Sequence, residues 1–137
     1  MKKFSKYIVS SLVLFAIILG CTKDDDDENS PFVDPRDKFL GTWSVNNESC
    51  NSRRYQVTIT NDPSNTALVL LTNFAFSQAS VPDTALITGS NITLPLQFNS
   101  EKWQIKGNGK YESGKIQWSY TLIISADEQQ CTSTYTQ

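Results

Sequence analysis

The sequence predicts a small all-β domain over residues 37–137, in which short antiparallel strands form either a barrel or a sandwich. Polar and apolar residues alternate along several segments, which is typical of strands with one buried and one solvent-exposed face. Clusters of Asn, Asp, Gly, Pro and Ser separate these segments, as tight turns require. No segment after Pro35 has a helical period of adequate length, apart from one short turn expected at Phe39 and Leu40. We therefore expect about six to eight short strands in a meander.

The alternation also predicts which side chains face the core. Residues 54–60 place Tyr55, Val57 and Ile59 on one face, and residues 102–111 and 115–122 repeat the pattern. The side chains expected to point inward are those of Trp43, Tyr55, Phe98, Trp103, Ile105, Tyr111, Trp118, Tyr120 and Leu122.

Two segments depart from strict alternation. Residues 91–98 contain Pro95, which lacks a backbone N–H and predicts an edge strand or a bulge. Residues 72–78 place Phe74 and Phe76 among polar residues. As part of a loop, these two rings either face a partner or roof a barrel mouth; alternatively, they pack inward at the end of a strand.

The first 20 residues predict an export signal. Lys2, Lys3 and Lys6 precede an uncharged apolar run over residues 8–19, which is shorter than the roughly 20 residues of a transmembrane helix. The segment Ile18-Leu19-Gly20-Cys21 then resembles the lipobox of bacterial lipoproteins, although that family prefers Leu followed by a small residue where this chain has Ile18 and Leu19. The resemblance implies cleavage after Gly20, lipidation of Cys21 and a membrane anchor.

Residues 21–36 predict an acidic tether. Five consecutive carboxylates, Asp24 to Glu28, repel one another and favour a solvated, extended chain. A lysine followed by acidic residues close to the lipidated cysteine resembles the surface-export signal of Bacteroidota lipoproteins. The resemblance implies an outer-membrane lipoprotein displayed at the cell surface, and a plain spacer is the alternative.

Charge and composition argue against several function classes. The chain has 12 basic and 14 acidic residues; removal of the signal takes three lysines and leaves a net charge of about −5. The domain itself is nearly neutral, so we expect no nucleic-acid partner. The chain contains no histidine, and its acidic residues Asp83, Glu48, Glu101 and Glu112 are scattered singly, so we expect neither an enzyme nor a metal or other cofactor.

The cysteines predict a disulfide. Once Cys21 is lipidated, Cys50 and Cys131 remain, and two cysteines in an exported domain pair by default. Their pairing would join the end of the first strand to the last strand, and these two strands are neighbours in a closed barrel.

The segment Phe39-Leu40-Gly41-Thr42-Trp43 resembles the Gly-x-Trp opening of lipocalins and their short bacterial relatives. The resemblance implies an up-and-down barrel in which Gly41 permits a bend and Trp43 plugs the floor. The chain departs from lipocalins in having no basic residue after Lys115, where they carry an arginine that packs on the tryptophan, and in its shorter length. Together with the cysteine pairing, the resemblance favours a barrel over a sandwich.

Two functions from different classes follow. If the barrel is hollow, Tyr55, Trp103, Tyr111, Trp118 and Tyr120 line a pocket for a small apolar ligand. If these rings fill the barrel, the domain is an interaction or accessory protein that binds a protein partner with its outer faces. The outward lysines Lys102, Lys106 and Lys110 suit an anionic glycan or lipid headgroup, or are simply solvated. Asp83-Thr84-Ala85 resembles the short O-glycosylation motif of the same bacterial group, which implies a glycan on Thr84.

Overall fold

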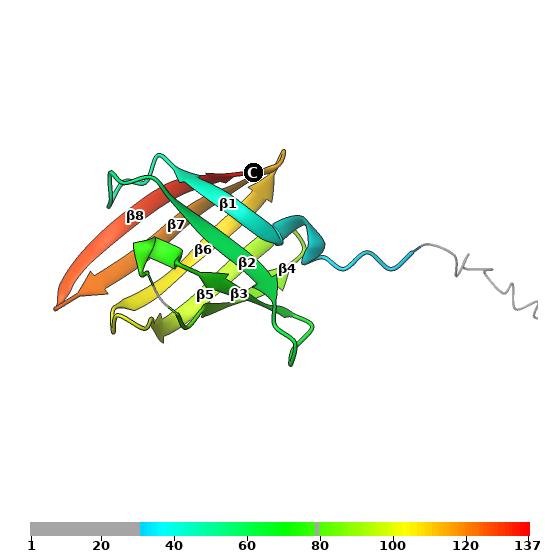
Figure 1. The fold of residues 1–137 in the computed structure, drawn as a ribbon, viewed down its shortest axis with the longest axis horizontal. Coiled ribbons are helices and arrows are strands. Elements are labelled where there is room, and N and C mark those ends of the chain that lie inside the picture. Colours follow the sequence, from blue (N-terminus) through cyan, green and yellow to red (C-terminus); the bar gives the residue numbers. More distant parts are fainter. Residues whose placement is uncertain (1–30, 79) are drawn as a thin grey trace, which may run out of the picture. The chain divides into compact units, whose positions relative to one another are not determined.

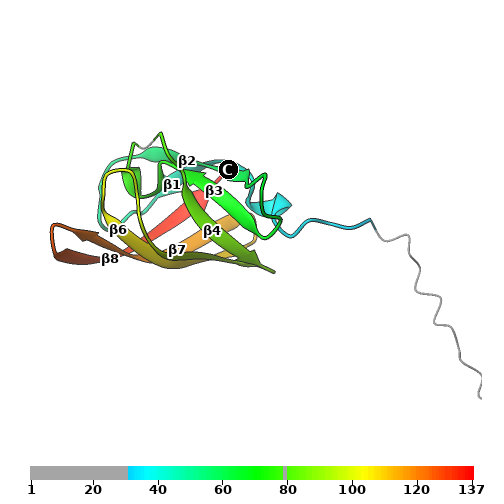
Figure 2. The same ribbon diagram turned by 90° about the horizontal axis from the view of Figure 1, so that it is seen from below.

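The barrel closes on itself through its first and last strands. The computed structural model of the protein describes residues 31–78 and 80–137, and Phe32–Gln137 form one compact unit (Figure 1). Eight antiparallel strands follow one another around a closed barrel, in which β1 pairs with both β2 and β8 (Figure 2). The elements are η1 (Asp37–Phe39), β1 (Gly41–Asn46), β2 (Tyr55–Asn61), β3 (Leu68–Thr72), η2 (Phe74–Phe76), β4 (Asp83–Thr88), β5 (Asn91–Phe98), β6 (Gln104–Glu112), β7 (Lys115–Ile124) and β8 (Asp127–Thr136). The prediction of an all-β up-and-down barrel is confirmed, and the sandwich alternative is wrong.

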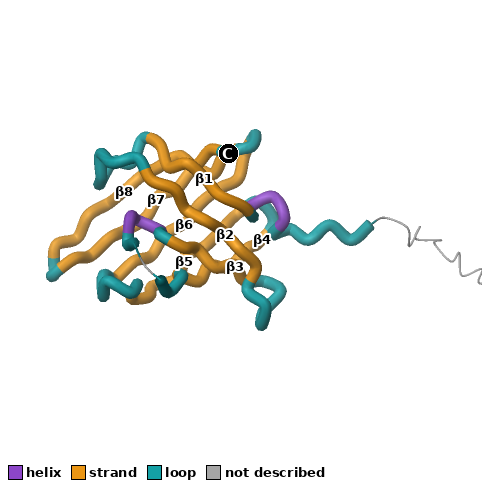
Figure 3. The backbone as a smooth tube through the Cα atoms, viewed as in Figure 1, coloured by secondary structure: helices purple, strands orange, loops and turns teal. Residues whose placement is uncertain are grey.

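Helical structure in the described residues is limited to two short turns. Figure 3 shows η1 immediately before β1 and η2 immediately after β3. No helix within residues 31–78 and 80–137 is long and apolar enough to cross a membrane. The predicted signal peptide, the lipidation site at Cys21 and most of the predicted tether lie outside the described residues.

The predicted disulfide is confirmed. Cys50, in the segment between β1 and β2, is bonded to Cys131 on β8, and the two Cα atoms are 5.4 Å apart. The bond encloses a loop of 81 residues. On the chain-entropy model, a loop of this length stabilises the fold by about 4.5 kcal/mol.

A bulge in β5 overturns the inward placement of Phe98. The register between β5 and β6 shifts between Leu94 and Gln97, around Pro95, as the proline predicted. The extra residue reverses the alternation, so Phe98 points outward and is 67% exposed.

The side chain of Gln97 joins β5 to β4 beyond their last register pair, Leu86 with Thr93. Its Nε2 donates to the backbone oxygen of Thr84 at 2.8 Å, and the backbone N–H of Thr84 donates to its Oε1 at 3.0 Å. Thr84 is half-buried on β4, and its glycosylation stays a prediction.

Candidate functional site

Aromatic rings close the end of the barrel at which the chain enters. Trp43 is completely buried, and its indole N–H donates a 2.7 Å hydrogen bond to the backbone oxygen of Phe39 in η1. Tyr111, near the end of β6, lies edge-on to both rings, with centroid distances of 5.7 Å to Phe39 and 6.4 Å to Trp43. We call this end the Trp43 end. Lipocalins pack an arginine on the corresponding tryptophan, and this chain has no basic residue after Lys115. Here Tyr111 packs on Trp43.

Gly41, at the start of β1, has a backbone conformation that favours glycine. Its φ of +118° is a value that residues with a side chain rarely adopt. A Cβ atom there would lie 2.8 Å from Nε2 of Gln137, the atom that donates to the backbone oxygen of Leu40 at 2.9 Å. Gly41 thus allows the start of β1 to approach the C-terminus of the chain.

Arg36 fixes the segment that leads into the barrel. Its guanidinium pairs with the carboxylate of Asp34 at 2.6 Å and donates to the backbone oxygens of Asn65 and Leu68 at 3.2 and 3.3 Å. The segment before η1 is thereby held against the connection between β2 and β3.

Phe74 fills the opposite end, which we call the Phe74 end. Odd-numbered strands run in one direction, so η2, which follows β3, lies at the end away from η1 (Figure 1). Phe74 is completely buried, and its ring centroid is 4.9 Å from those of both Trp118 and Tyr120, in edge-to-face geometry. This arrangement is favourable for aromatic pairs. Of the two predicted roles for residues 72–78, Phe74 has the inward-packing one.

The backbone that carries Phe74 is strained. Asn73, Ala75, Phe76 and Gln78 all have φ between 49° and 68°, in the left-handed region that favours glycine. The Asn73 side chain supports this conformation, because its Nδ2 donates to the backbone oxygen of Gln56 at 2.9 Å and its Oδ1 accepts from the N–H of Gln78 at 2.9 Å.

The interior between the two ends is occupied by side chains. Among the predicted ligand-lining residues, Trp118 and Tyr120 are each 3% exposed and Tyr55 is 8% exposed. Trp103 and Tyr111 lie elsewhere: Trp103 is half-buried in the turn before β6, and Tyr111 packs at the Trp43 end. The structure therefore brings three of the five together, in a packed core rather than around a cavity.

Several polar groups are buried in this core without a hydrogen-bond partner among the described residues. They include Oδ2 of Asp83, Nε1 of Trp118, Oγ of Ser133 and the hydroxyl of Tyr135. Trp118 and Ser133 are register partners on β7 and β8. Asp83 is 2% exposed, and burial raises the pKa of its carboxyl to about 6. An unpaired carboxyl in such a place favours its neutral form.

Glu48 reaches toward the barrel interior from the segment between β1 and β2. The hydroxyl of Tyr55 donates to Oε2 of Glu48 at 3.0 Å. Burial and the neighbouring carboxylate of Glu48 raise the pKa of Tyr55 above its usual value. The ligand atoms of Glu48, Cys50 and Cys131 lie within 4.8 Å of one another, but the two sulfurs are joined in the disulfide and are not available as thiolate ligands for a metal.

Apolar side chains are exposed on the outer surface. Val81, Leu96 and Phe98 are each more than 60% exposed, and Leu86 on β4 is 41% exposed. They belong to β4, β5 and the segment that leads into β4.

Two buried polar residues, Asp83 and Tyr135, were not predicted from the sequence. Asp83 shares the inward parity of Ala85 and Ile87 on β4, and this parity was the available signal for its burial. Tyr135 is completely buried on β8. This strand is rich in Thr, Ser and Gln, so its two faces differ little in polarity and the sequence did not indicate which one is buried.

Comparison with known proteins leaves the barrel without an assigned relative. No family model, no curated protein and no solved structure matches this chain.

Proposed function

We propose that the protein is a lipid-anchored module of the bacterial cell envelope that binds a partner with the outer surface of its barrel. The observation that carries this proposal is the packed interior. Trp43 and Phe74 are completely buried at the two ends of the barrel, and Tyr135, also completely buried, packs on Trp118 with ring centroids 5.8 Å apart. A barrel filled by its own side chains presents its outer faces and loops for recognition.

The proposed cellular location is supported by the N-terminal residues. The lipobox-like Gly20-Cys21 supports an anchor in the outer membrane, and the acidic run Asp24 to Glu28 supports display at the cell surface. The scattered acidic residues and the absence of histidine support a binding role rather than an enzymatic one.

A second candidate function is the binding of a small apolar molecule inside the barrel. It is favoured by the left-handed residues that hold Phe74, because strained segments are often the ones that move. The ligand would take the place of the Phe74 ring between Trp118 and Tyr120. This binding requires Phe74 to leave the core, and therefore exposes a large aromatic side chain to solvent.

The anchor is tested by the substitution Cys21→Ser. We expect metabolic labelling with a fatty-acid analogue to tag the wild-type protein, and Cys21→Ser to lose both the tag and its place in the membrane fraction. The double variant Cys50→Ser with Cys131→Ser is the matched control and should keep the tag. A tag that persists in Cys21→Ser would contradict the proposed anchor.

A further inference from the structure

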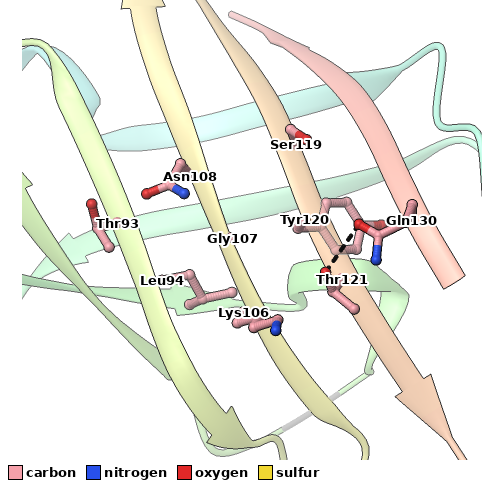
Figure 4. A pocket seen from close by; sticks show the side chains of 9 residues that line it. All are labelled: Thr93, Leu94, Lys106, Gly107, Asn108, Ser119, Tyr120, Thr121 and Gln130. Atoms are coloured by element: carbon pink, nitrogen blue, oxygen red, sulfur yellow. Dashed lines mark hydrogen bonds between the residues drawn. The ribbon is translucent and has the colours of Figure 1, made fainter. Parts of the chain in front are cut away.

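A shallow groove of about 370 Å³ crosses the outer face of the barrel over strands β5 to β8 (Figure 4). Its position coincides with Gly107 on β6. A Cβ atom at Gly107 would lie 2.4 Å from Cβ of Tyr120 and 2.7 Å from the backbone oxygen of Ser119, so no other residue fits there. Glycines of this kind bend strands in small barrels. Lys106 and Asn108, the exposed neighbours of Gly107 on β6, line the groove on either side of it.

Two rows of polar side chains lie on either side of Gly107. Thr93, Asn108 and Ser119 are register partners on β5, β6 and β7. The second row consists of Lys106, Thr121 and Gln130, which are register partners on β6, β7 and β8. Because neighbouring strands are about 4.8 Å apart, each row presents hydrogen-bonding groups at that spacing.

The two rows differ in the hydrogen bonds that their side chains already make within the protein. Within the described residues, Thr93, Asn108 and Ser119 make no side-chain hydrogen bond with the protein. In the other row, Thr121 donates to Oε1 of Gln130 at 3.1 Å, and this bond orients both side chains (Figure 4).

Lys106 adds one uncompensated charge to the groove. Among the described residues no carboxylate lies within ion-pair distance of its ammonium group, whereas Lys110 on the same strand lies 3.4 Å from the carboxylate of Glu112. The exposed apolar side chains of Leu86, Leu96 and Phe98 do not line the groove. The site is therefore polar, with a single cation at one side.

We infer that this groove binds an acidic saccharide. Hydroxyl and amide side chains both donate and accept hydrogen bonds, as the neighbouring hydroxyls of a sugar ring require. The ammonium of Lys106 suits the carboxylate of a uronic acid as a point charge. The volume is at the lower end of the range for small-molecule sites. An open groove of this kind buries one face of its ligand, so we expect a dissociation constant on the order of 1 mM for a monosaccharide. The inference rests on the proposed function, whose partner surface it specifies.

The test is a titration of the isotope-labelled domain, residues 32–137, followed through its backbone amide NMR signals. We expect D-glucuronate to cause saturable shifts at Asn108, Ser119 and Thr121, and D-glucose to bind more weakly at the same residues. Lys106→Gln should weaken glucuronate binding by about tenfold and leave glucose binding unchanged. Lys110→Gln makes the same charge change on the same strand and should have no effect. The double variant Asn108→Ala with Ser119→Ala should lose binding of both sugars.

Three results would overturn the inference. They are no saturable shift with either sugar, equal shifts with sodium sulfate, and equal effects of Lys106→Gln and Lys110→Gln. Sulfate binding alone would identify an anion site without saccharide recognition. None of these results bears on the packed interior, whereas a ligand that shifted the signals of Phe74 and Tyr135, which are completely buried and do not line the groove, would contradict the proposed function itself.

Discussion

We expect Trp43→Ala to lower the free energy of unfolding by about 3–5 kcal/mol. The substitution empties a completely buried site, removes the edge-on contact with Tyr111, and leaves the backbone oxygen of Phe39 without its donor. The loss is measured by denaturant unfolding followed by far-ultraviolet circular dichroism, which does not depend on the fluorescence of the removed ring.

Two further variants separate the contributions to this loss. Trp103→Ala also deletes an indole, but from a half-buried position, and should cost clearly less. Trp43→Phe keeps most of the apolar volume and should cost about 1–3 kcal/mol, mainly through the unpaired oxygen of Phe39. Equal losses for Trp43→Ala and Trp103→Ala would mean that Trp43 does not close the barrel end.

We expect Asp83→Asn to stabilise the protein at pH 8 and to change its stability much less at pH 4. Burial raises the pKa of the Asp83 carboxyl from 3.8 to about 6. Below about pH 4 the carboxyl is neutral in both the folded and the unfolded protein, and the stability of the wild type is unaffected by its charge. As the pH rises through about 6, the buried carboxyl must ionise, and part of this stability is lost. A shift of this size corresponds to about 3 kcal/mol, and the uncharged amide avoids that loss.

The measurement is the free energy of unfolding of both proteins between pH 4 and pH 8. Asp127→Asn is the matched control, because Asp127 is exposed at the start of β8. The free energy of unfolding of the Asp127→Asn variant should follow that of the wild type from pH 4 to pH 8. An equal change in stability at pH 4 and pH 8 for Asp83→Asn would show that the buried charge of Asp83 does not destabilise the fold.

The sequence was sufficient where a local pattern determines the structure. Tyr55, Val57 and Ile59 alternate with polar residues and are all buried on β2. Pro95 predicted an edge strand or a bulge because it cannot donate to the strand ladder, and a register shift lies there. The pairing of Cys50 with Cys131 followed from the expectation of an exported domain and from the scarcity of cysteines.

Other features depend on contacts between distant segments. Phe98 follows the pattern of an inward residue until the bulge reverses the alternation. The conformation around Phe74 places Ala75 and Phe76 in the left-handed region, which neither residue type indicates. The polar groove requires the register of β5 to β8, since Thr93, Asn108 and Ser119 are 15 and 11 positions apart in the sequence and become neighbours by pairing.

The most direct test of the packed, surface-binding barrel is native mass spectrometry of the protein extracted from the membranes of its own host in mild detergent. We expect the mass of residues 21–137 plus a covalent lipid, with no apolar small molecule retained. A stoichiometric apolar molecule that is released only on unfolding would contradict it, because such a ligand would have to occupy the place of Phe74 between Trp118 and Tyr120.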